Sequence, residues 1–219
     1  YIDIFDLLEL EDYYRTDAHW RQEKILDVAA RLAGGMGVEL TGSYTRKTLE
    51  KPFYGVYYGQ AALPIAPEEM NYLTGGAIDT AAVYNYETDT EGGIYDAEKA
   101  AGRDPYEMFL SGSVSLLRIE NPQNTSGGRL VIFRDSFGSS IAPLLVEGYS
   151  SVTLVDIRYL ASSRLGGFVD FTGCDVLFLY SAGVLNNSST LKLAKEPLLL
   201  GTALFIFCIY ALFFSRRAR

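Results

Sequence analysis

The sequence is poor in the residues that bind metals and cross-link chains. It has 219 residues, of which one is histidine and two are cysteines. A single histidine excludes a multi-histidine metal site. Cys174 and Cys208 are too few for a disulfide framework, and they lack the spacing of metal ligands. We therefore predict no metal and no cofactor.

Positive charge is also scarce. Lysine and arginine total 19 against 27 aspartate and glutamate residues, a formal net charge of −8. We expect no nucleic-acid partner, because phosphates require a basic surface. Hydrophobic residues make up 48% of the chain and charged residues 21%, a balance that suits the packed core of one α/β domain.

An uncharged run, residues 198–214, lies near the C-terminus. At about 1.5 Å per residue it would span roughly 25 Å as a helix, the short end of what a bilayer core requires. The arginines of the following segment, 215–219, favour the cytoplasm. We predict a linker at 191–197, a single transmembrane helix at 198–214, a basic cytoplasmic tail, and a domain at 1–190 on the outer face of the cell membrane. A buried core helix at 198–214 is the alternative.

Strand and helix patterns alternate in the C-terminal half. Residues 130–133 are wholly apolar, as in a strand covered on both faces, and 141–146 have a helical pattern. Residues 152–155 and 176–180 are two further buried strands. This order predicts an α/β fold with a mostly parallel sheet flanked by helices.

The N-terminal half is less regular. A helical pattern opens at Asp17–Trp20, continues to Leu32, and ends at Gly34 and Gly35. Residues 40–112 are rich in tyrosine and glycine, with strand-like pieces at 54–58 and 81–84, and we interpret them as an insertion that shapes a substrate cleft. Tyrosine has a flat apolar face with a polar tip, which suits carbohydrate, although tyrosines also fill half-exposed strand positions.

Ser136 lies just past the end of the strand at 130–133. Ligands in open α/β sheets gather beyond the carboxyl ends of the strands. A hydroxyl there is exposed, and the N–H groups of the following helix can stabilise an oxyanion. The alternative is that Ser136, Ser139 or Ser140 only caps that helix.

His19 is the single histidine, and Asp17 precedes it by two positions. In an extended segment, residues two apart point to the same side. Asp17 can therefore accept from Nδ1–H of His19 and leave Nε2 free to act as a base toward a serine. The alternative is a surface histidine beside a helix N-cap at Asp17.

Five segments of this chain occur in the order found in the bacterial DHHW protein family. They are residues 16–20, 104–112, 134–137, 156–159 and 177–180. The chain resembles this family, which is itself similar to the SGNH-like, flavodoxin-like domains of periplasmic alginate O-acetyltransferases. Family members have a longer N-terminal part, and this chain starts at Tyr1 without methionine, so we expect an N-terminally truncated domain.

The resemblance implies a catalytic triad of Ser136, His19 and Asp17. It also implies that Arg158 and Tyr180 lie near the site, and we assign these two residues and Phe137 to oxyanion or substrate binding. Ala18 replaces the first histidine of the family motif, so any role of that histidine is lost. For Arg158 a structural ion pair with Asp156 or Asp170 is the alternative.

The implied activity is acyl transfer through Ser136. Water as acceptor gives an esterase, and a glycan hydroxyl gives an O-acetyltransferase. The expected partner is an acylated or acceptor cell-surface polysaccharide, together with other polysaccharide-biosynthesis proteins. The alternative is a non-catalytic, membrane-anchored module that binds glycan or protein in a polysaccharide assembly or export system.

Overall fold

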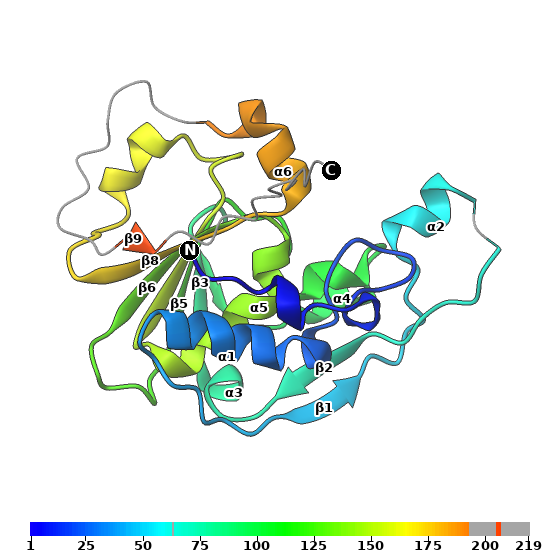
Figure 1. Ribbon diagram of the computed structural model, residues 1–219, viewed down its shortest axis with the longest axis horizontal. Coiled ribbons are helices and arrows are strands. Elements are labelled where there is room, and N and C mark those ends of the chain that lie inside the picture. Colours follow the sequence, from blue (N-terminus) through cyan, green and yellow to red (C-terminus); the bar gives the residue numbers. More distant parts are fainter. Residues whose placement is uncertain (63, 193–204, 207–219) are drawn as a thin grey trace, which may run out of the picture.

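The computed structural model describes residues 1–62, 64–192 and 205–206 (Figure 1). The strands are β1 (Thr45–Thr48), β2 (Asn71–Thr74), β3 (Ala82–Asn85), β4 (Thr90–Gly92), β5 (Leu116–Glu120), β6 (Arg129–Arg134), β7 (Ser151–Val155), β8 (Cys174–Leu179) and β9 (Phe205–Ile206). The α-helices are α1 (Leu26–Gly35), α2 (Val56–Gln60), α3 (Ala77–Thr80), α4 (Ala97–Ala101), α5 (Phe137–Leu145) and α6 (Ala182–Asn186). The 3₁₀-helices are η1 (Phe5–Leu7), η2 (Leu10–Asp12), η3 (Gln22–Lys24), η4 (Pro105–Met108), η5 (Val146–Gly148), η6 (Ser162–Gly167) and η7 (Ser188–Thr190).

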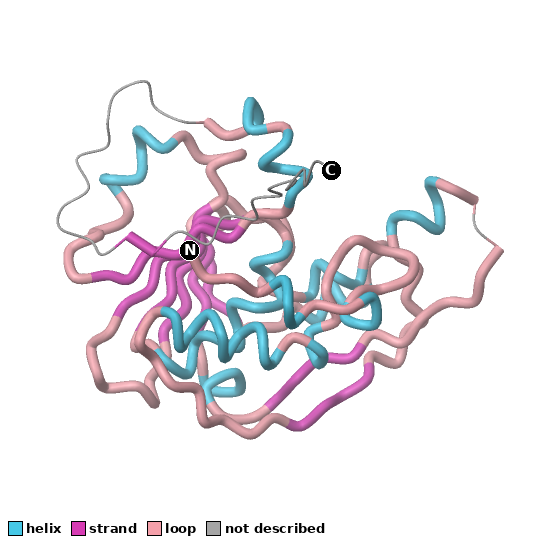
Figure 2. The backbone as a smooth tube through the Cα atoms, viewed as in Figure 1, coloured by secondary structure: helices cyan, strands magenta, loops and turns pink. Residues whose placement is uncertain are grey.

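The main sheet is mixed. In the described part of the chain it has seven strands in the order β4-β3-β5-β7-β6-β8-β9 (Figure 2). β6 pairs in parallel with β7 and β8, and β8 pairs in parallel with β9. The other pairings, β4-β3, β3-β5 and β5-β7, are antiparallel. The predicted strands near 130, 152 and 176 are confirmed, but the prediction of a mostly parallel sheet is wrong.

The antiparallel half has a weaker sequence pattern. β3 and β4 form an antiparallel hairpin, and such a hairpin has no crossover helix whose pattern would show in the sequence. β5 has exposed residues at Arg118 and Glu120 and so lacks an unbroken apolar run. The fold is accordingly a mixed α/β fold rather than a parallel one.

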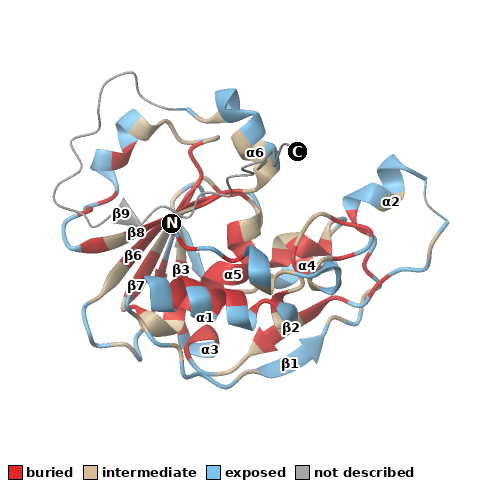
Figure 3. Cartoon of the chain, viewed as in Figure 1, coloured by how far each residue is buried: buried red, intermediate tan, exposed pale blue. Residues whose placement is uncertain are grey.

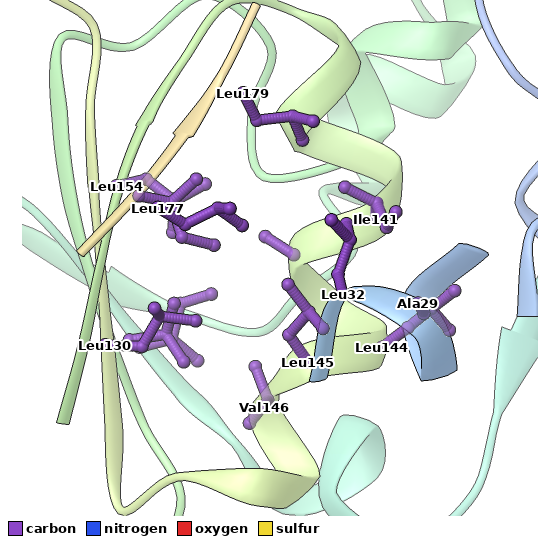
Figure 4. Packing of buried hydrophobic residues seen from close by; sticks show 14 of the residues in the cluster. Ala29, Leu32, Leu130, Ile141, Leu144, Leu145, Val146, Leu154, Leu177 and Leu179 are labelled. Atoms are coloured by element: carbon purple, nitrogen blue, oxygen red, sulfur yellow. The ribbon is translucent and has the colours of Figure 1, made fainter. Parts of the chain in front are cut away.

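The two faces of β6 are buried against different elements. Leu130 and Ile132 face the larger core, in which α1 and α5 cover the sheet (Figure 4). Val131 and Phe133 point to the opposite face and join a second core. This alternation follows from the two-residue period of a strand. Because both faces are covered, β6 is apolar at every position from 130 to 133, as the sequence predicts.

The helix predicted from Asp17 begins nine residues later, at Leu26. Asp17 lies instead in a loop that an isolated bridge between Tyr13 and Trp20 closes. The loop is stable without helical hydrogen bonds because distant residues accept from its backbone, as described for the site below. α1 itself ends at Gly35, as its Gly-Gly pair predicts.

The segment 40–112 divides into two parts. β1 and β2 form a separate two-stranded sheet, and a third hydrophobic core at Tyr14, Phe53 and Tyr106 packs nearby. β3 and β4 instead belong to the main sheet. The strand-like piece predicted at 54–58 is wrong, because α2 begins at Val56. The piece predicted at 81–84 is confirmed by β3. α2 projects from the body of the molecule and is largely exposed (Figures 1 and 3).

Most of the predicted transmembrane segment 198–214, the preceding linker from residue 193 and the tail 215–219 lie outside the described residues. Phe205 and Ile206 are the exception, and they form β9 beside β8, where the prediction has helix. In the described part of the chain, β9 is the outermost strand on this side of the main sheet. Among the described residues no helix has the length and hydrophobicity to cross a bilayer.

Candidate active site

Ser136 occupies the N-cap position of α5, directly beyond the carboxyl end of β6. Its side chain does not cap the helix. Instead, Ser136 Oγ lies 2.7 Å from His19 Nε2. Asp135 takes the capping role, since its Oδ1 accepts from the N–H of Phe137 at 3.0 Å. The hydroxyl of Ser136 therefore contacts His19 and does not cap the helix.

His19 connects Ser136 to Asp17. His19 Nδ1 lies 2.5 Å from Asp17 Oδ1, and the His19 N–H donates to the same oxygen at 3.0 Å. The tautomer with its proton on Nδ1 fits both ring contacts, leaving Nε2 to accept from Ser136. The imidazole is 18% exposed and the Asp17 side chain 1%. The predicted row of contacts is present, with its aspartate shielded from water.

The charge of Asp17 is stabilised by hydrogen bonds. Burial by itself would raise its pKa, but the bond from His19, the charge of His19 and the N–H groups of Val56 and His19 outweigh burial and lower the pKa. The Val56 N–H donates to Oδ2 at 3.0 Å. Asp17 thus stays ionised beside the imidazole, as a group that orients a base must.

Glu68 fixes the loop that carries Asp17 and His19. One carboxylate oxygen accepts from the Arg15 N–H at 3.0 Å, and the other accepts from the Thr16 N–H and Oγ1, both at 2.9 Å. Thr16 Oγ1 in turn accepts from the Gly55 N–H at 3.0 Å. A Cβ at Gly55 would lie 2.2 Å from the Thr16 carbonyl oxygen, so this close approach requires glycine.

Gln22 ties the same loop to the helix of the serine. It is fully buried. Its Nε2 donates to the Ser140 carbonyl in α5 at 3.0 Å, and its Oε1 accepts from the Leu73 N–H in β2 at 2.8 Å. Gln22 therefore connects the base to the nucleophile across more than 100 residues of sequence.

Aromatic rings hold the imidazole from two sides. Tyr106 stacks on His19 with 4.1 Å between ring centroids and 18° between planes. Phe137 lies 5.3 Å from the imidazole at 44° and also packs edge-on against Trp20 at 5.0 Å. Tyr106 is buried, and burial raises the pKa of its hydroxyl. The predicted residue Phe137 thus contacts the base, while its N–H is committed to Asp135.

Arg134 connects the start of α5, next to Ser136, to the segment around Gly112. It is fully buried, and its Nη1 donates to Ser139 Oγ at 3.1 Å. Its Nη2 donates to the carbonyls of Gly112 and Val114 at 3.3 and 3.2 Å. Gly112 ends a run of left-handed residues with Leu110 at φ 54° and Ser111 at φ 57°. Such backbone is strained for residues with a side chain, and it persists where surrounding contacts fix it.

The other two predicted residues follow neighbouring strands. Arg158, after β7, forms a bidentate ion pair with the buried Asp156, with Nε at 2.9 Å and Nη2 at 2.6 Å. The side-chain hydrogen bond to Asp156 raises the pKa of Arg158. The structural ion pair with Asp156, which is the alternative role of Arg158, is therefore present. Tyr180, after β8, is buried, and its hydroxyl has no hydrogen-bond partner among the described residues. Burial, with the charges of Asp156 and Asp135, raises the pKa of Tyr180.

The turn at Asp135 links these elements. Its Oδ2 accepts from the Ser181 N–H at 2.7 Å, directly after Tyr180.

Within residues 1–62 and 64–192 we find no group of three or more His, Cys, Asp or Glu side chains able to hold a metal ion. Sequence reasoning missed the roles of Glu68, Gln22 and Arg134. It placed Tyr106 in a motif without assigning it a contact.

The fold and this row of contacts define a class: an α/β protein in which a serine at a strand end, a histidine and a buried aspartate have the arrangement of a Ser-His-Asp triad. The chain belongs to the DHHW family, because the family model described as DHHW protein matches residues 8–155. The match includes Ser136, His19 and Asp17 and ends before Arg158 and Tyr180. No curated protein matches the sequence significantly.

Solved structures share the fold. A DHHW family protein from Eubacterium siraeum is 22% identical, with a TM-score of 0.64, and the match covers 84% of this chain and 65% of that one. PatB1 of Bacillus cereus, solved with a sulfonyl adduct and in a second structure, is 20% identical with a TM-score of 0.57. That match covers 80% of this chain and 62% or 63% of PatB1. The chain therefore spans less than two thirds of the length of these relatives.

Proposed function

We propose that this chain is an SGNH-like serine acyltransferase or esterase, with Ser136 as nucleophile, His19 as base and Asp17 as the group that orients it. The 2.7 Å contact between Ser136 Oγ and His19 Nε2 carries this proposal. Ser136 and His19 are both partly exposed, so a substrate can reach them.

The reaction follows from the contacts. Ser136 Oγ attacks the acyl carbonyl carbon while its proton passes to His19 Nε2. The tetrahedral intermediate collapses, the alcohol leaves with the proton from His19, and the acyl group remains on Ser136. An acceptor hydroxyl then gives its proton to His19 and takes the acyl group, and His19 passes that proton to the departing Ser136 Oγ. Asp17 stabilises the imidazolium formed in both steps.

The oxyanion requires N–H donors that are not already engaged. In the part of the chain that the structure describes, the Ser136 N–H has no acceptor. It lies at the N-terminus of α5, where the helix dipole favours negative charge. We assign this N–H to the oxyanion, with Arg158 and Tyr180 near the substrate as the family resemblance implies.

The acyl acceptor is, in this proposal, a hydroxyl of a cell-surface polysaccharide, and water in the esterase case. The contacts of Ser136, His19 and Asp17 support acyl chemistry, in a fold shared with PatB1. A sulfonyl adduct, as carried by one PatB1 structure, is the product of an activated nucleophile displacing a leaving group from sulfur. Polysaccharide-biosynthesis proteins remain proposed partners, and an outer-face location remains a prediction of the sequence.

A fluorophosphonate probe tests the nucleophile. The full-length chain should acquire the label at Ser136, as located by mass spectrometry of peptides, and Ser136→Ala should remove it. Ser163→Ala is the matched control, because Ser163 is an exposed serine in the short helix η6. Absence of label from the well-folded wild-type chain would contradict the proposal and leave a non-catalytic binding module.

Membrane attachment has a separate test. Segment 198–214 predicts that the chain resists extraction by alkaline carbonate, and that a reporter fused after Arg219 is active in the cytoplasm. Release by carbonate would reject the membrane span without bearing on Ser136.

A further inference from the structure

A cleft of about 650 Å³ lies between α2 and the start of η4. One wall is formed by the tyrosines Tyr54 and Tyr58, together with Gly55, Val56, Gly59 and Gln60. The other wall carries Arg103, Asp104 and Glu107. The mechanism described above uses none of these side chains.

Both walls are attached to the triad. The Val56 N–H donates to Asp17 Oδ2, and the Tyr57 N–H donates to the Thr16 carbonyl at 2.9 Å. On the other wall, Asp104 accepts from the Tyr106 N–H at 3.0 Å, and Tyr106 is the ring that stacks on His19. Burial, with the charges of Asp17 and Glu107, raises the pKa of Asp104, consistent with its position close to the triad. The cleft therefore adjoins the Asp17 side of the triad and the ring that stacks on His19.

The lining combines aromatic surface with hydrogen-bonding groups. The Tyr54 and Tyr58 rings lie 4.7 Å apart at 56°, and Tyr54 is 44% exposed, so apolar ring surface faces solvent. Gln60, Arg103 and Asp104 add an amide, a guanidinium and a carboxylate. Flat apolar surface beside donors and acceptors suits a pyranose ring, which has apolar C–H faces and an equatorial belt of hydroxyls.

The charges in the cleft balance. Glu107 is neutralised by Lys99, whose Nζ lies 2.9 Å from Oε2. Arg103 and Asp104 then contribute one positive and one negative charge. A uronic acid carboxylate would meet as much negative as positive charge, whereas a neutral sugar can use both groups as hydrogen-bond partners.

We propose that this cleft is a subsite for one neutral sugar ring of the acceptor glycan, with Tyr58 and Arg103 as its specificity-determining residues. As an acceptor site it rests on the proposed acyl transfer, but binding of the sugar does not require the chemistry. The subsite would position a neighbouring part of the same glycan toward Ser136.

Binding is measured by isothermal titration on the full chain carrying Ser136→Ala, so that no turnover occurs. The ligands are two neutral trisaccharides, chitotriose and cellotriose, and the anionic trigalacturonate. At least one neutral trisaccharide should bind, and trigalacturonate should bind at least tenfold more weakly. If neither neutral sugar binds at millimolar concentration, or if trigalacturonate binds equally well, the proposal is wrong.

Matched variants locate the site. Tyr58→Ala and Arg103→Ala should each weaken binding of the neutral sugar at least tenfold. Tyr57→Ala should change it less than twofold, because Tyr57 is an exposed tyrosine of the same helix that does not line the cleft. Arg103 is exposed, so its variant tests the site even if Tyr58→Ala folds poorly. Equal losses in Tyr57→Ala and Tyr58→Ala, or none in Arg103→Ala, would overturn the assignment.

The two proposals fail separately. Hydrolysis of 4-nitrophenyl acetate by the wild-type chain reports on the triad alone. Absent hydrolysis with intact sugar binding rejects the acyl transfer and keeps the subsite as a glycan-binding site. Hydrolysis without sugar binding rejects the subsite and keeps the triad.

Discussion

Ser136 and His19 are positioned by different means. Ser136 follows β6 and begins α5, two elements whose residues are buried almost throughout. His19 and Asp17 lie in a loop without regular secondary structure, which hydrogen bonds to distant segments hold, each with a side chain as one partner. Packing of a strand and a helix therefore places the nucleophile, while individual polar contacts place its base. Polar contacts are the more easily broken of the two, because each depends on one side chain.

The largest expected effect is loss of the nucleophile or its base. Ser136→Ala and His19→Ala should each lower turnover of 4-nitrophenyl acetate by about 10⁴-fold or more. The double variant should be no worse than either single one, because members of a triad act as a unit. Additive losses would mean that the two residues work independently. Circular dichroism should show unchanged folding, and full activity in a folded Ser136→Ala protein would reject the triad.

Asp17→Asn should cost less than either of these, by about tenfold or more. The serine and the base remain, but the amide no longer stabilises the imidazolium and can hold the wrong tautomer. Turnover of 4-nitrophenyl acetate gives the readout, and circular dichroism checks that the variant is folded. Wild-type turnover in a folded Asp17→Asn protein would mean that Asp17 does not support the base.

Glu68 tests whether the polar contacts place the base. Glu68→Ala removes the acceptor of the Arg15 and Thr16 N–H groups and should cost about 1–3 kcal/mol of unfolding free energy, with a turnover loss of about tenfold or more. Burial raises the pKa of Glu68, but the hydrogen bonds from Arg15 and Thr16 lower it overall, below its ordinary 4.5.

The sign of the pH dependence follows from that lowered pKa. Glu68 contributes stability above about pH 4.5, and this contribution is lost as the pH falls below 4.5 through the folded-state pKa. Urea unfolding of wild type and Glu68→Gln between pH 3 and 7 should show a smaller acid-induced loss in the variant. Equal curves would show that Glu68 is not ionised in the fold.

Tyr106 tests a second kind of contact to the base, because its ring stacks on His19. Tyr106→Leu should lower turnover by about 2- to 12-fold, corresponding to the ~0.5–1.5 kcal/mol of a ring contact. Tyr106→Phe keeps the stacked face and should restore most of the activity. If Phe and Leu behave alike, the hydroxyl rather than the stacking supports the base.

The smallest effect is expected on the serine side. Ser139 Oγ accepts from Arg134, and Ser139→Ala should cost about 1 kcal/mol of stability while turnover stays within about threefold. Thermal unfolding and the nitrophenyl acetate assay measure the two quantities. A turnover loss as large as that of Glu68→Ala would remove the difference between the two sides of the site.

The sequence by itself determined the parts that depend on local pattern. The apolar run 130–133 predicts β6 because a strand covered on both faces has no polar position. The spacing of Asp17 and His19 and the turn at Ser136 make these residues candidates, and the resemblance to the DHHW family implies the triad. The start of α1 and the antiparallel strands β4 and β5 were not predicted, because neither has a distinct local signal.

Tertiary structure decided the contacts that no local pattern encodes. Glu68 binds the backbone 52 residues away at Thr16, and Tyr106 stacks on His19 from a distant position in the sequence. Whether Ser136 caps its helix or faces a base depends on which hydrogen-bond partner the fold brings within reach. The charge balance of the cleft depends likewise on Lys99 reaching Glu107. A carboxylate or a hydroxyl has the same chemistry wherever it stands in the sequence, and only its neighbours in space select the contact it makes.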